Sequence, residues 1–219
     1  MDRDFYDDIL IITGGNLDIN FAKIYLNEQS FDYIIAADSG LKYVKELDLT
    51  PNYILGDYDS VPKDVLDFFK DKDIKTYPTH KDYTDTHLAI ITAIKLAPKN
   101  ITILGGTGTR LDHTLTTIGN LKALLDLNIT GTIIDSHNKI YLLDKGSSHV
   151  IEKEAQFGDF VSIIPLEKEI CISLKGFYYP LDHVTITQGL SLTQSNEITA
   201  NKAYISIHSG IAIVIEARD

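Results

Sequence analysis

The run Ile9-Leu10-Ile11-Ile12, followed by Thr13-Gly14-Gly15-Asn16, is the clearest indication of the fold class in this chain. A continuous run of large apolar side chains is typical of a strand that is covered on both faces, as the strands of parallel sheets are. The glycines and the asparagine that follow are residues of tight turns. The stretch therefore predicts a buried strand that ends in a turn at the edge of a sheet.

Short apolar runs of this kind alternate with helical stretches from the start of the chain to about Asp144. The expected strands are Ile9–Thr13, Tyr33–Ala37, Tyr53–Leu55, Ile74–Tyr77, Ile101–Leu104 and Gly131–Asp135. The expected helices lie near Phe21–Asn27, Leu41–Glu46, Pro62–Asp71, Thr84–Leu96 and Leu111–Asp126. Such alternation predicts an α/β fold in which a parallel sheet carries helices on both faces.

Four polar turns follow expected strands of this sheet. Open parallel sheets bind ligands beyond the carboxyl ends of their strands, where turns that are distant in sequence can converge. The turns are Thr13-Gly14-Gly15-Asn16, Asp38-Ser39-Gly40, Gly56–Ser60 and Gly105–Arg110. We therefore expect the functional site of this domain at that edge of the sheet.

The sequence changes character after about Lys145, where short β-rich segments replace the alternation. The expected strands here are His149–Glu154, Asp159–Pro165, Glu169–Leu174, Val184–Thr187, Tyr204–Ile207 and Ile211–Glu216. The last two flank His208-Ser209-Gly210, which predicts a hairpin turn with glycine at positive φ. The predicted organisation is an α/β domain at residues 1–145 and a small antiparallel β-domain at residues 146–219, whose own core would be marginal.

Composition excludes several classes of protein. The 219 residues are 44% hydrophobic and carry a formal net charge of −11, which argues against a nucleic-acid surface because such surfaces need clustered Lys and Arg. No apolar segment approaches the length of a membrane span, and the first residues do not resemble a signal peptide. Cys171 is the single cysteine, so no internal disulfide forms. These features predict a cytoplasmic protein that binds neither nucleic acid nor membranes.

Two acidic clusters, Gly56-Asp57-Tyr58-Asp59-Ser60 and Lys81-Asp82-Tyr83-Thr84-Asp85, each follow an apolar run. Asp57 and Asp59 are two residues apart, so an extended backbone would point both carboxylates the same way. A Mg²⁺ ion, which takes one or two carboxylates together with waters and substrate phosphates, would offset their repulsion. The alternatives are a solvated acidic turn for the first cluster and a helix cap at Asp82 or Thr84 for the second.

A glycine-rich segment, Gly105-Gly106-Thr107-Gly108-Thr109-Arg110-Leu111-Asp112-His113, follows an expected strand and opens a helix. Glycines let a ligand approach the backbone, and the N–H groups at a helix start bind anions. Arg110 adds a planar set of donors that matches phosphate. The segment fits neither the P-loop nor the dinucleotide fingerprint, so it indicates a phosphate site of another kind.

Taken in order, these segments and two later ones, Gly176–Leu181 and Ser195-Asn196-Glu197, resemble the thiamine pyrophosphokinases of the bacterial type. The resemblance implies an α/β catalytic domain followed by a β-sandwich domain that binds thiamine, in a homodimer with shared active sites. It also implies transfer of a pyrophosphoryl group from ATP to the hydroxyl of thiamine, which yields thiamine diphosphate and AMP.

The resemblance assigns roles to individual residues of this sequence. The carboxylates that correspond to the Mg²⁺ site are Asp57, Asp59 and Asp85. The residues that correspond to the ATP site are Asp38, Lys81, Asp82, Gly106 and Arg110, and Asp112 is the candidate that orients or deprotonates the hydroxyl. Ser195 and Asn196 correspond to a thiamine-binding pair. The chain has no Trp, so a Tyr, Phe or aliphatic side chain would have to stack on thiamine.

Two other functions fit part of this pattern. An Asp-x-Asp motif also serves transferases that use metal-bound nucleotide sugars, but that function leaves Lys81–Asp85 and Ser195–Glu197 unexplained. A sensor that binds thiamine or a nucleotide without turnover would show ligand binding and no release of AMP.

Overall fold

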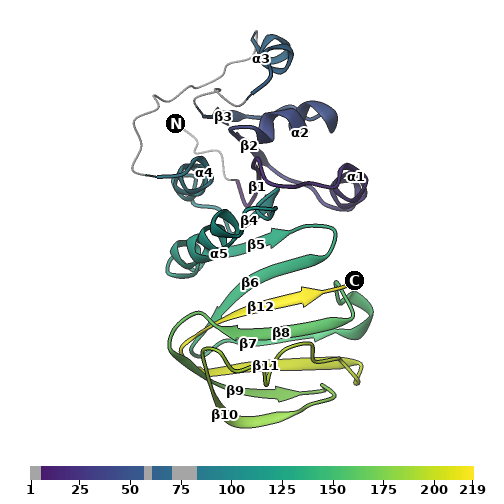
Figure 1. The fold of residues 1–219 in the computed structure, drawn as a ribbon, viewed down its shortest axis with the longest axis vertical. Coiled ribbons are helices and arrows are strands. Elements are labelled where there is room, and N and C mark those ends of the chain that lie inside the picture. The colour runs from purple at the N-terminus through teal and green to yellow at the C-terminus, as the bar shows by residue number, and fades with distance from the viewer. Residues whose placement is uncertain (1–5, 57–60, 71–82) are drawn as a thin grey trace. The chain divides into compact units, whose positions relative to one another are not determined.

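The computed structural model describes residues 6–56, 61–70 and 83–219. The contacts within the chain divide it into two units, Met1–Ser136 and His137–Asp219 (Figure 1). This division lies before the boundary predicted after Lys145, because the strand Asn138–Asp144 pairs within the second unit. Within the described ranges, no helix combines the length and apolar character needed to cross a membrane.

The first unit contains a parallel sheet with the strand order β3-β2-β1-β4-β5. Helices α1 and α2 lie on one side of this sheet and helices α4 and α5 on the other (Figure 1). The elements are β1 (Asp8–Ile12), α1 (Ile19–Glu28), β2 (Tyr33–Ala37), α2 (Gly40–Glu46), β3 (Tyr53–Leu55), α3 (Lys63–Phe69), α4 (Asp85–Ile94), β4 (Asn100–Leu104), α5 (Leu111–Leu125) and β5 (Thr130–Ile134). The predicted fold of this domain is confirmed, and the predicted strand Ile74–Tyr77 lies outside the described residues.

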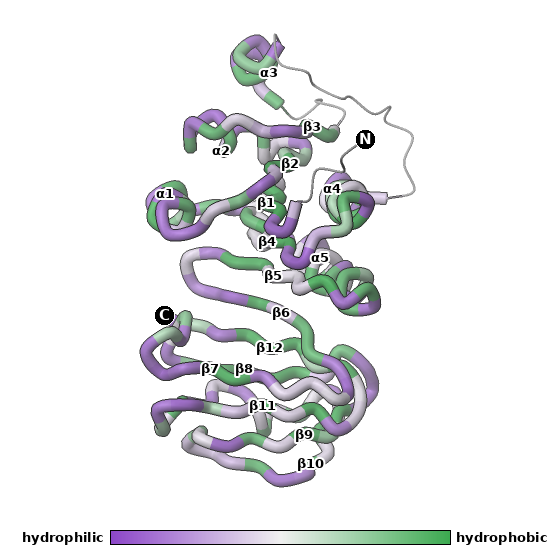
Figure 2. The backbone as a smooth tube through the Cα atoms, turned by 180° about the vertical axis from the view of Figure 1, so that it is seen from behind, coloured by the Kyte–Doolittle hydropathy of each residue, from purple (hydrophilic) through white to green (hydrophobic). Residues whose placement is uncertain are grey.

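Strand β1 forms the middle of this sheet because its side chains are apolar on both faces. Ile9, Leu10, Ile11 and Ile12 are all 0% exposed, and β1 pairs with β2 on one side and β4 on the other. A polar residue at any of these positions would lie in the core without water. The helices have one buried and one exposed side, and green and purple alternate along α5 in Figure 2 accordingly.

The second unit is a sandwich of two antiparallel sheets. One sheet pairs β12 with β6 and β8, and the other has the strand order β10-β9-β11-β7. The elements are β6 (Asn138–Asp144), β7 (Ser148–Glu152), the short helix η1 (Lys153–Ala155), β8 (Phe160–Pro165), β9 (Glu169–Lys175), β10 (Leu181–Thr187), β11 (Lys202–Ser209) and β12 (Ile211–Ala217). A single cluster of buried side chains from both sheets fills the interior, which confirms the β-sandwich.

The hairpin predicted around His208-Ser209-Gly210 is wrong. Strands β11 and β12 follow one another directly, but β11 pairs with β9 and β7, whereas β12 pairs with β6 and β8. Gly210, with φ of +77°, turns the chain from one sheet into the other. A glycine at positive φ permits either a hairpin or such a corner, and the packing of the two sheets decides between them.

Candidate functional site

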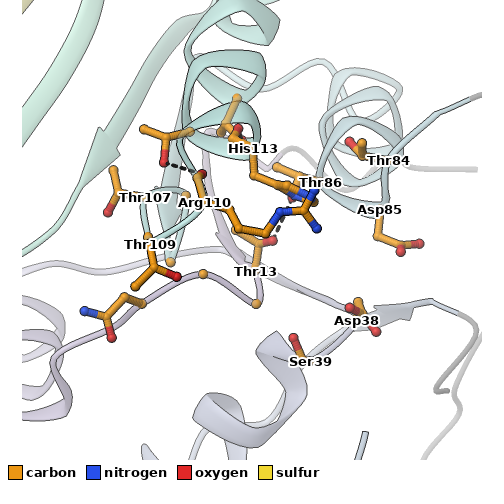
Figure 3. A pocket seen from close by; sticks show the side chains of 18 of the residues that line it. Thr13, Asp38, Ser39, Thr84, Asp85, Thr86, Thr107, Thr109, Arg110 and His113 are labelled. Carbon is orange, nitrogen blue, oxygen red and sulfur yellow. Dashed lines mark hydrogen bonds between the residues drawn. The ribbon is translucent and has the colours of Figure 1, made fainter. Parts of the chain in front are cut away.

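A pocket of about 690 Å³ lies at the carboxyl ends of the parallel strands of the first unit. Its lining brings together three of the four predicted turns and adds the start of helix α4. The lining residues used below are Thr13, Gly15, Asn16, Asp38, Ser39, Tyr43, Thr84, Asp85, Thr86, Gly106, Thr107, Thr109, Arg110 and His113. Figure 3 shows Asp38 and Asp85 on one side of this pocket and Thr107 and Thr109 on the other.

Two backbone hydrogen bonds join the turn after β1 to the turn after β4. The N–H of Gly15 donates to the carbonyl of Gly105 at 2.9 Å, and the N–H of Asn16 donates to the carbonyl of Thr107 at 2.8 Å. The hydroxyl of buried Tyr43 also donates to the carbonyl of Gly15 at 2.8 Å. These bonds give the glycine-rich wall of the pocket a defined shape before any ligand binds.

Gly15→Ala is expected to lower the free energy of unfolding by about 1–3 kcal/mol, the usual cost of overpacking. A Cβ at this position would collide with the carbonyl oxygens of Gly105 and Thr107, and both belong to the backbone. Urea denaturation measures the effect. The matched control is Gly119→Ala in helix α5, where a Cβ meets no atom of the described structure within 4 Å. Because alanine favours helix, that variant should gain up to about 1 kcal/mol. Equal losses in both variants would contradict the close approach at Gly15.

Asp38 and Asp85 supply the carboxylates of the described part of the pocket. Asp38 directly follows strand β2 and has a φ of +48°, a conformation that aspartate tolerates better than most residues. Asp85 stands in the first turn of α4, after Thr84, whose Oγ1 accepts from the N–H of His87 at 3.3 Å and caps the helix. Of the two predicted cap residues, Asp82 and Thr84, it is Thr84 that caps α4. The carboxylate of Asp85 is therefore not needed as a helix cap.

The other predicted residues of the acidic clusters, Asp57, Asp59, Lys81 and Asp82, lie outside the described residues. Within the described ranges, no group of three or more His, Cys, Asp or Glu side chains is placed to hold a metal ion. Asp38 and Asp85 nevertheless provide oxygen donors of the kind that Mg²⁺ takes from proteins, one or two carboxylates at a time. The carboxylates of Asp38 and Asp85 thus fit Mg²⁺. The full set of ligands for this ion stays a prediction.

Several threonines in the pocket carry contacts that sequence patterns did not reveal. The hydroxyls of Thr13 and Thr86 lie 2.7 Å apart and join the end of β1 to the first turn of α4 (Figure 3). The hydroxyl of Thr107 donates to Asp135 at 2.6 Å, which holds the glycine-rich segment to the end of β5. Thr13 was part of a predicted turn. No sequence pattern indicated the contacts of Thr86 and Asp135, because their partners are distant in sequence.

Arg110 and Asp112 form an ion pair at the start of α5. Arg110 donates from Nη2 to Oδ2 of Asp112 at 2.6 Å and from Nε to Oδ1 at 3.2 Å. Both side chains are well exposed, at 68% and 64%. The hydrogen bonds from Arg110 lower the pKa of Asp112, and the same contact raises the pKa of Arg110. Gly106, Arg110 and His113 all line the pocket, so the predicted phosphate segment faces this cavity.

Ser195 and Asn196 of the second unit differ sharply in their surroundings. Ser195 is exposed, has φ of +53° and donates its backbone N–H to Oγ of Ser162 at 2.9 Å. Asn196 is 3% exposed, and its side chain hydrogen-bonds the backbone of Tyr179. The assignment of both residues to a thiamine site stays a prediction.

Comparison with known proteins covers both units. The model of the thiamin pyrophosphokinase catalytic domain matches residues 23–133, and that of the thiamin pyrophosphokinase vitamin B1 binding domain matches residues 148–212. Thiamine pyrophosphokinase of Bacillus subtilis is 31% identical over 188 residues, which are 84% of this chain and 87% of that protein.

Solved structures agree with this result. Thiamin pyrophosphokinase of Geobacillus thermodenitrificans has a TM-score of 0.85 at 28% identity, covering 97% of this chain and 98% of that chain. The enzyme of Candida albicans shares the fold, with a TM-score of 0.82 at 19% identity over 97% of this chain and 89% of that one. The family models match both units, and the relative from Bacillus subtilis is 31% identical to the chain. This chain therefore belongs to the thiamine pyrophosphokinase family.

Proposed function

We propose that this protein transfers the pyrophosphoryl group of ATP to the hydroxyl of thiamine and releases AMP. The observation that carries the proposal is the match of the two units, in order, to a catalytic and a vitamin B1 binding domain of one family. The pocket adds physical support, since it combines two carboxylates, a guanidinium and a glycine-rich wall at the carboxyl ends of parallel strands.

In this reaction the thiamine oxygen forms a bond to the β-phosphorus of ATP, and the bond from that phosphorus to the oxygen of the leaving AMP breaks. Such transfer depends on positioning and on offsetting charge more than on covalent catalysis. Arg110 is suited to hold a phosphate because its planar donors match two oxygens at once. Lys81 is the second cation that we assign to the phosphates from the sequence.

We assign the carboxylates Asp57, Asp59 and Asp85 to a Mg²⁺ site. When bound, the ion supplies positive charge to phosphate oxygens. The placement of Asp85 in the pocket wall supports its part in this assignment, and Asp57 and Asp59 rest on the sequence. Asp38, at the end of β2, is the further described carboxylate that faces the same cavity.

We also propose that the protein acts in the cytoplasm as a homodimer in which active sites are shared. Two exposed leucines support a surface that a second copy of the chain could contact. Leu111 and Leu115 lie one turn apart at the start of α5, directly after Arg110, and are 70% and 67% exposed. Large apolar side chains left exposed side by side on a helix favour burial against another surface.

The decisive experiment incubates the protein with ATP, Mg²⁺ and thiamine and identifies the products by chromatography. The expected products are AMP and thiamine diphosphate in equal amounts. Appearance of ADP with thiamine monophosphate would overturn pyrophosphoryl transfer. Binding of thiamine without release of AMP would favour the sensor over the enzyme.

A further inference from the structure

Two threonine hydroxyls in the pocket, those of Thr13 and Thr86, form a hydrogen-bonded pair. The two oxygens lie 2.7 Å apart, and either can be the donor (Figure 3). Such a pair carries two hydrogens and uses one of them for the bond between its members. Within residues 6–56, 61–70 and 83–219, neither side chain makes another hydrogen bond. One hydroxyl hydrogen is therefore left for a ligand in the cavity that both residues line.

The burial of the two residues decides which of them keeps that hydrogen. Thr13 is 6% exposed, whereas Thr86 is half-buried. If Thr86 donated to Thr13, the unused hydrogen would belong to the buried residue, and a buried donor without an acceptor costs free energy. The opposite orientation, in which Thr13 donates, leaves the hydrogen on the more exposed residue, where a ligand can accept it. The structure therefore favours Thr86 as the donor toward the cavity.

Thr13 is held firmly enough to orient its partner. It directly follows β1, and its N–H donates to the carbonyl of Leu104 in β4 at 2.9 Å. A Cβ at Gly40 or at Gly105 would collide with the backbone of Thr13, so both glycines already pack closely against it. The hydroxyl of Thr86 therefore has a defined position before a ligand binds, and this preorganisation lowers the entropy that binding costs.

The other threonines of the pocket lack this combination of features. Three of them already donate their hydroxyl hydrogen to an acceptor of the protein: Thr107, Thr114 and Thr117. Thr84 and Thr109 are exposed, so water satisfies their hydroxyls. Thr86 alone among the described threonines of the lining joins an unused hydrogen to partial burial and to a partner that fixes its direction.

The surroundings of Thr86 select a ligand that accepts hydrogen bonds. Arg110 and the glycine-rich segment line the same cavity. An ionised phosphate only accepts hydrogen bonds, so it suits a guanidinium, backbone N–H groups and a hydroxyl whose hydrogen is unused. We propose that the hydroxyl of Thr86 donates to a phosphate oxygen of ATP, and that Thr13 is the positioning residue that orients it. The proposal rests on the proposed function, because it names a group of the same site.

The first test titrates α,β-methylene-ATP, an analogue that cannot transfer its pyrophosphoryl group, into the full-length protein with Mg²⁺ by calorimetry. Thr86→Val keeps the shape of the side chain and removes the hydroxyl. It should raise the dissociation constant roughly tenfold, as expected for the loss of a hydrogen bond to a charged group. Thr86→Ser keeps the hydroxyl and should bind as the unchanged protein does. An unchanged dissociation constant in Thr86→Val would overturn the proposal.

The matched control for Thr86→Val is Thr92→Val. Thr92 lies on the same helix and is half-buried, but it does not line the pocket. Thr92→Val should therefore leave the dissociation constant unchanged. A rise as large as that in Thr86→Val would trace both effects to the helix and count against a contact with ATP.

The second test separates a ligand contact from a merely structural one. Thr86→Val leaves the buried hydroxyl of Thr13 without its partner and should lower Tm, whereas Thr13→Val/Thr86→Val removes both hydroxyls and should restore most of the loss. The dissociation constant of the double variant should stay raised roughly tenfold, because the donor to phosphate is still missing. Recovery of affinity together with Tm would reduce the pair to a structural contact and refute the proposal.

The role of Thr13 follows from the same set of variants. Thr13→Val alone should raise the dissociation constant less than Thr86→Val does, and it should add nothing to that change in the double variant. The reason is that a positioning residue acts only through the hydroxyl that it orients. Fully additive effects would give Thr13 a contact of its own and contradict its positioning role.

Two further measurements identify the ligand group and keep the two proposals apart. Inorganic tripolyphosphate should lose affinity for Thr86→Val in parallel with the analogue. A loss confined to the analogue would move the contact to the ribose or the base and overturn the assignment to phosphate. The product assay on the unchanged protein tests the proposed function: absence of AMP refutes that function, whereas equal binding by all variants refutes only the role of Thr86.

Discussion

Asp85→Asn is expected to lower kcat by about 100-fold or more while the protein keeps its fold, since a group that offsets phosphate charge can be worth that much. Asparagine has nearly the same shape as aspartate but no charge. Thr84 caps α4, so the helix should still start at the same place. The measurements are kcat, the dependence of the rate on Mg²⁺ concentration, and calorimetric titration of Mn²⁺ as a direct measure of metal binding.

The matched control for Asp85 is Asp64→Asn. Asp64 is also a carboxylate in the first turn of a helix, α3, where it pairs with Lys45 at 2.7 Å. Both variants lose the same favourable interaction with the helix dipole, but only Asp85 lines the pocket. Asp57→Asn, in the other acidic cluster, should behave as Asp85→Asn does. Near-normal activity of Asp85→Asn at saturating Mg²⁺ would remove Asp85 from the metal site.

Arg110→Ala should lower kcat about 1000-fold, because an arginine that stabilises a transferring phosphoryl group contributes on that order. Asp112→Asn should cost much less. In the structure the carboxylate of Asp112 accepts two hydrogen bonds from Arg110, and the lowered pKa makes it a weaker base. We therefore expect Asp112 to hold the guanidinium in place, rather than to deprotonate the hydroxyl.

Steady-state kinetics over a range of pH separates these two roles of Asp112. The ion pair of Lys122 and Asp126 at the C-terminal end of the same helix, at 2.7 Å, provides the control, since exposed ion pairs contribute little to stability. Lys122→Ala and Asp126→Asn should leave kcat unchanged. A loss in Asp112→Asn as large as that in Arg110→Ala, together with loss of the acidic limb of the pH profile, would restore Asp112 as the base.

Patterns within short segments were enough to predict the fold class of both units. The all-apolar run Ile9–Ile12 predicted a strand buried on both faces, and all four residues are fully buried. The second unit was recognised as antiparallel from short segments with turns between them. By contrast, β6 (Asn138–Asp144) was not predicted, and β11 and β12 were taken as a hairpin although they belong to different sheets. Local patterns report which face of a strand is buried but not which strand lies beside it.

The candidate site, like the fold, was predicted from the sequence only in part. The sequence by itself determined where the pocket lies, because the polar turns Thr13–Asn16, Asp38–Gly40 and Gly105–Arg110 follow parallel strands whose carboxyl ends meet at one edge. Only the tertiary structure decided which groups meet there and elsewhere: Thr13 with Thr86, Thr107 with Asp135, and Asn196 with Tyr179. Periodicity and turn chemistry act between neighbours in sequence, whereas these hydrogen bonds depend on packing that brings distant segments within about 3 Å.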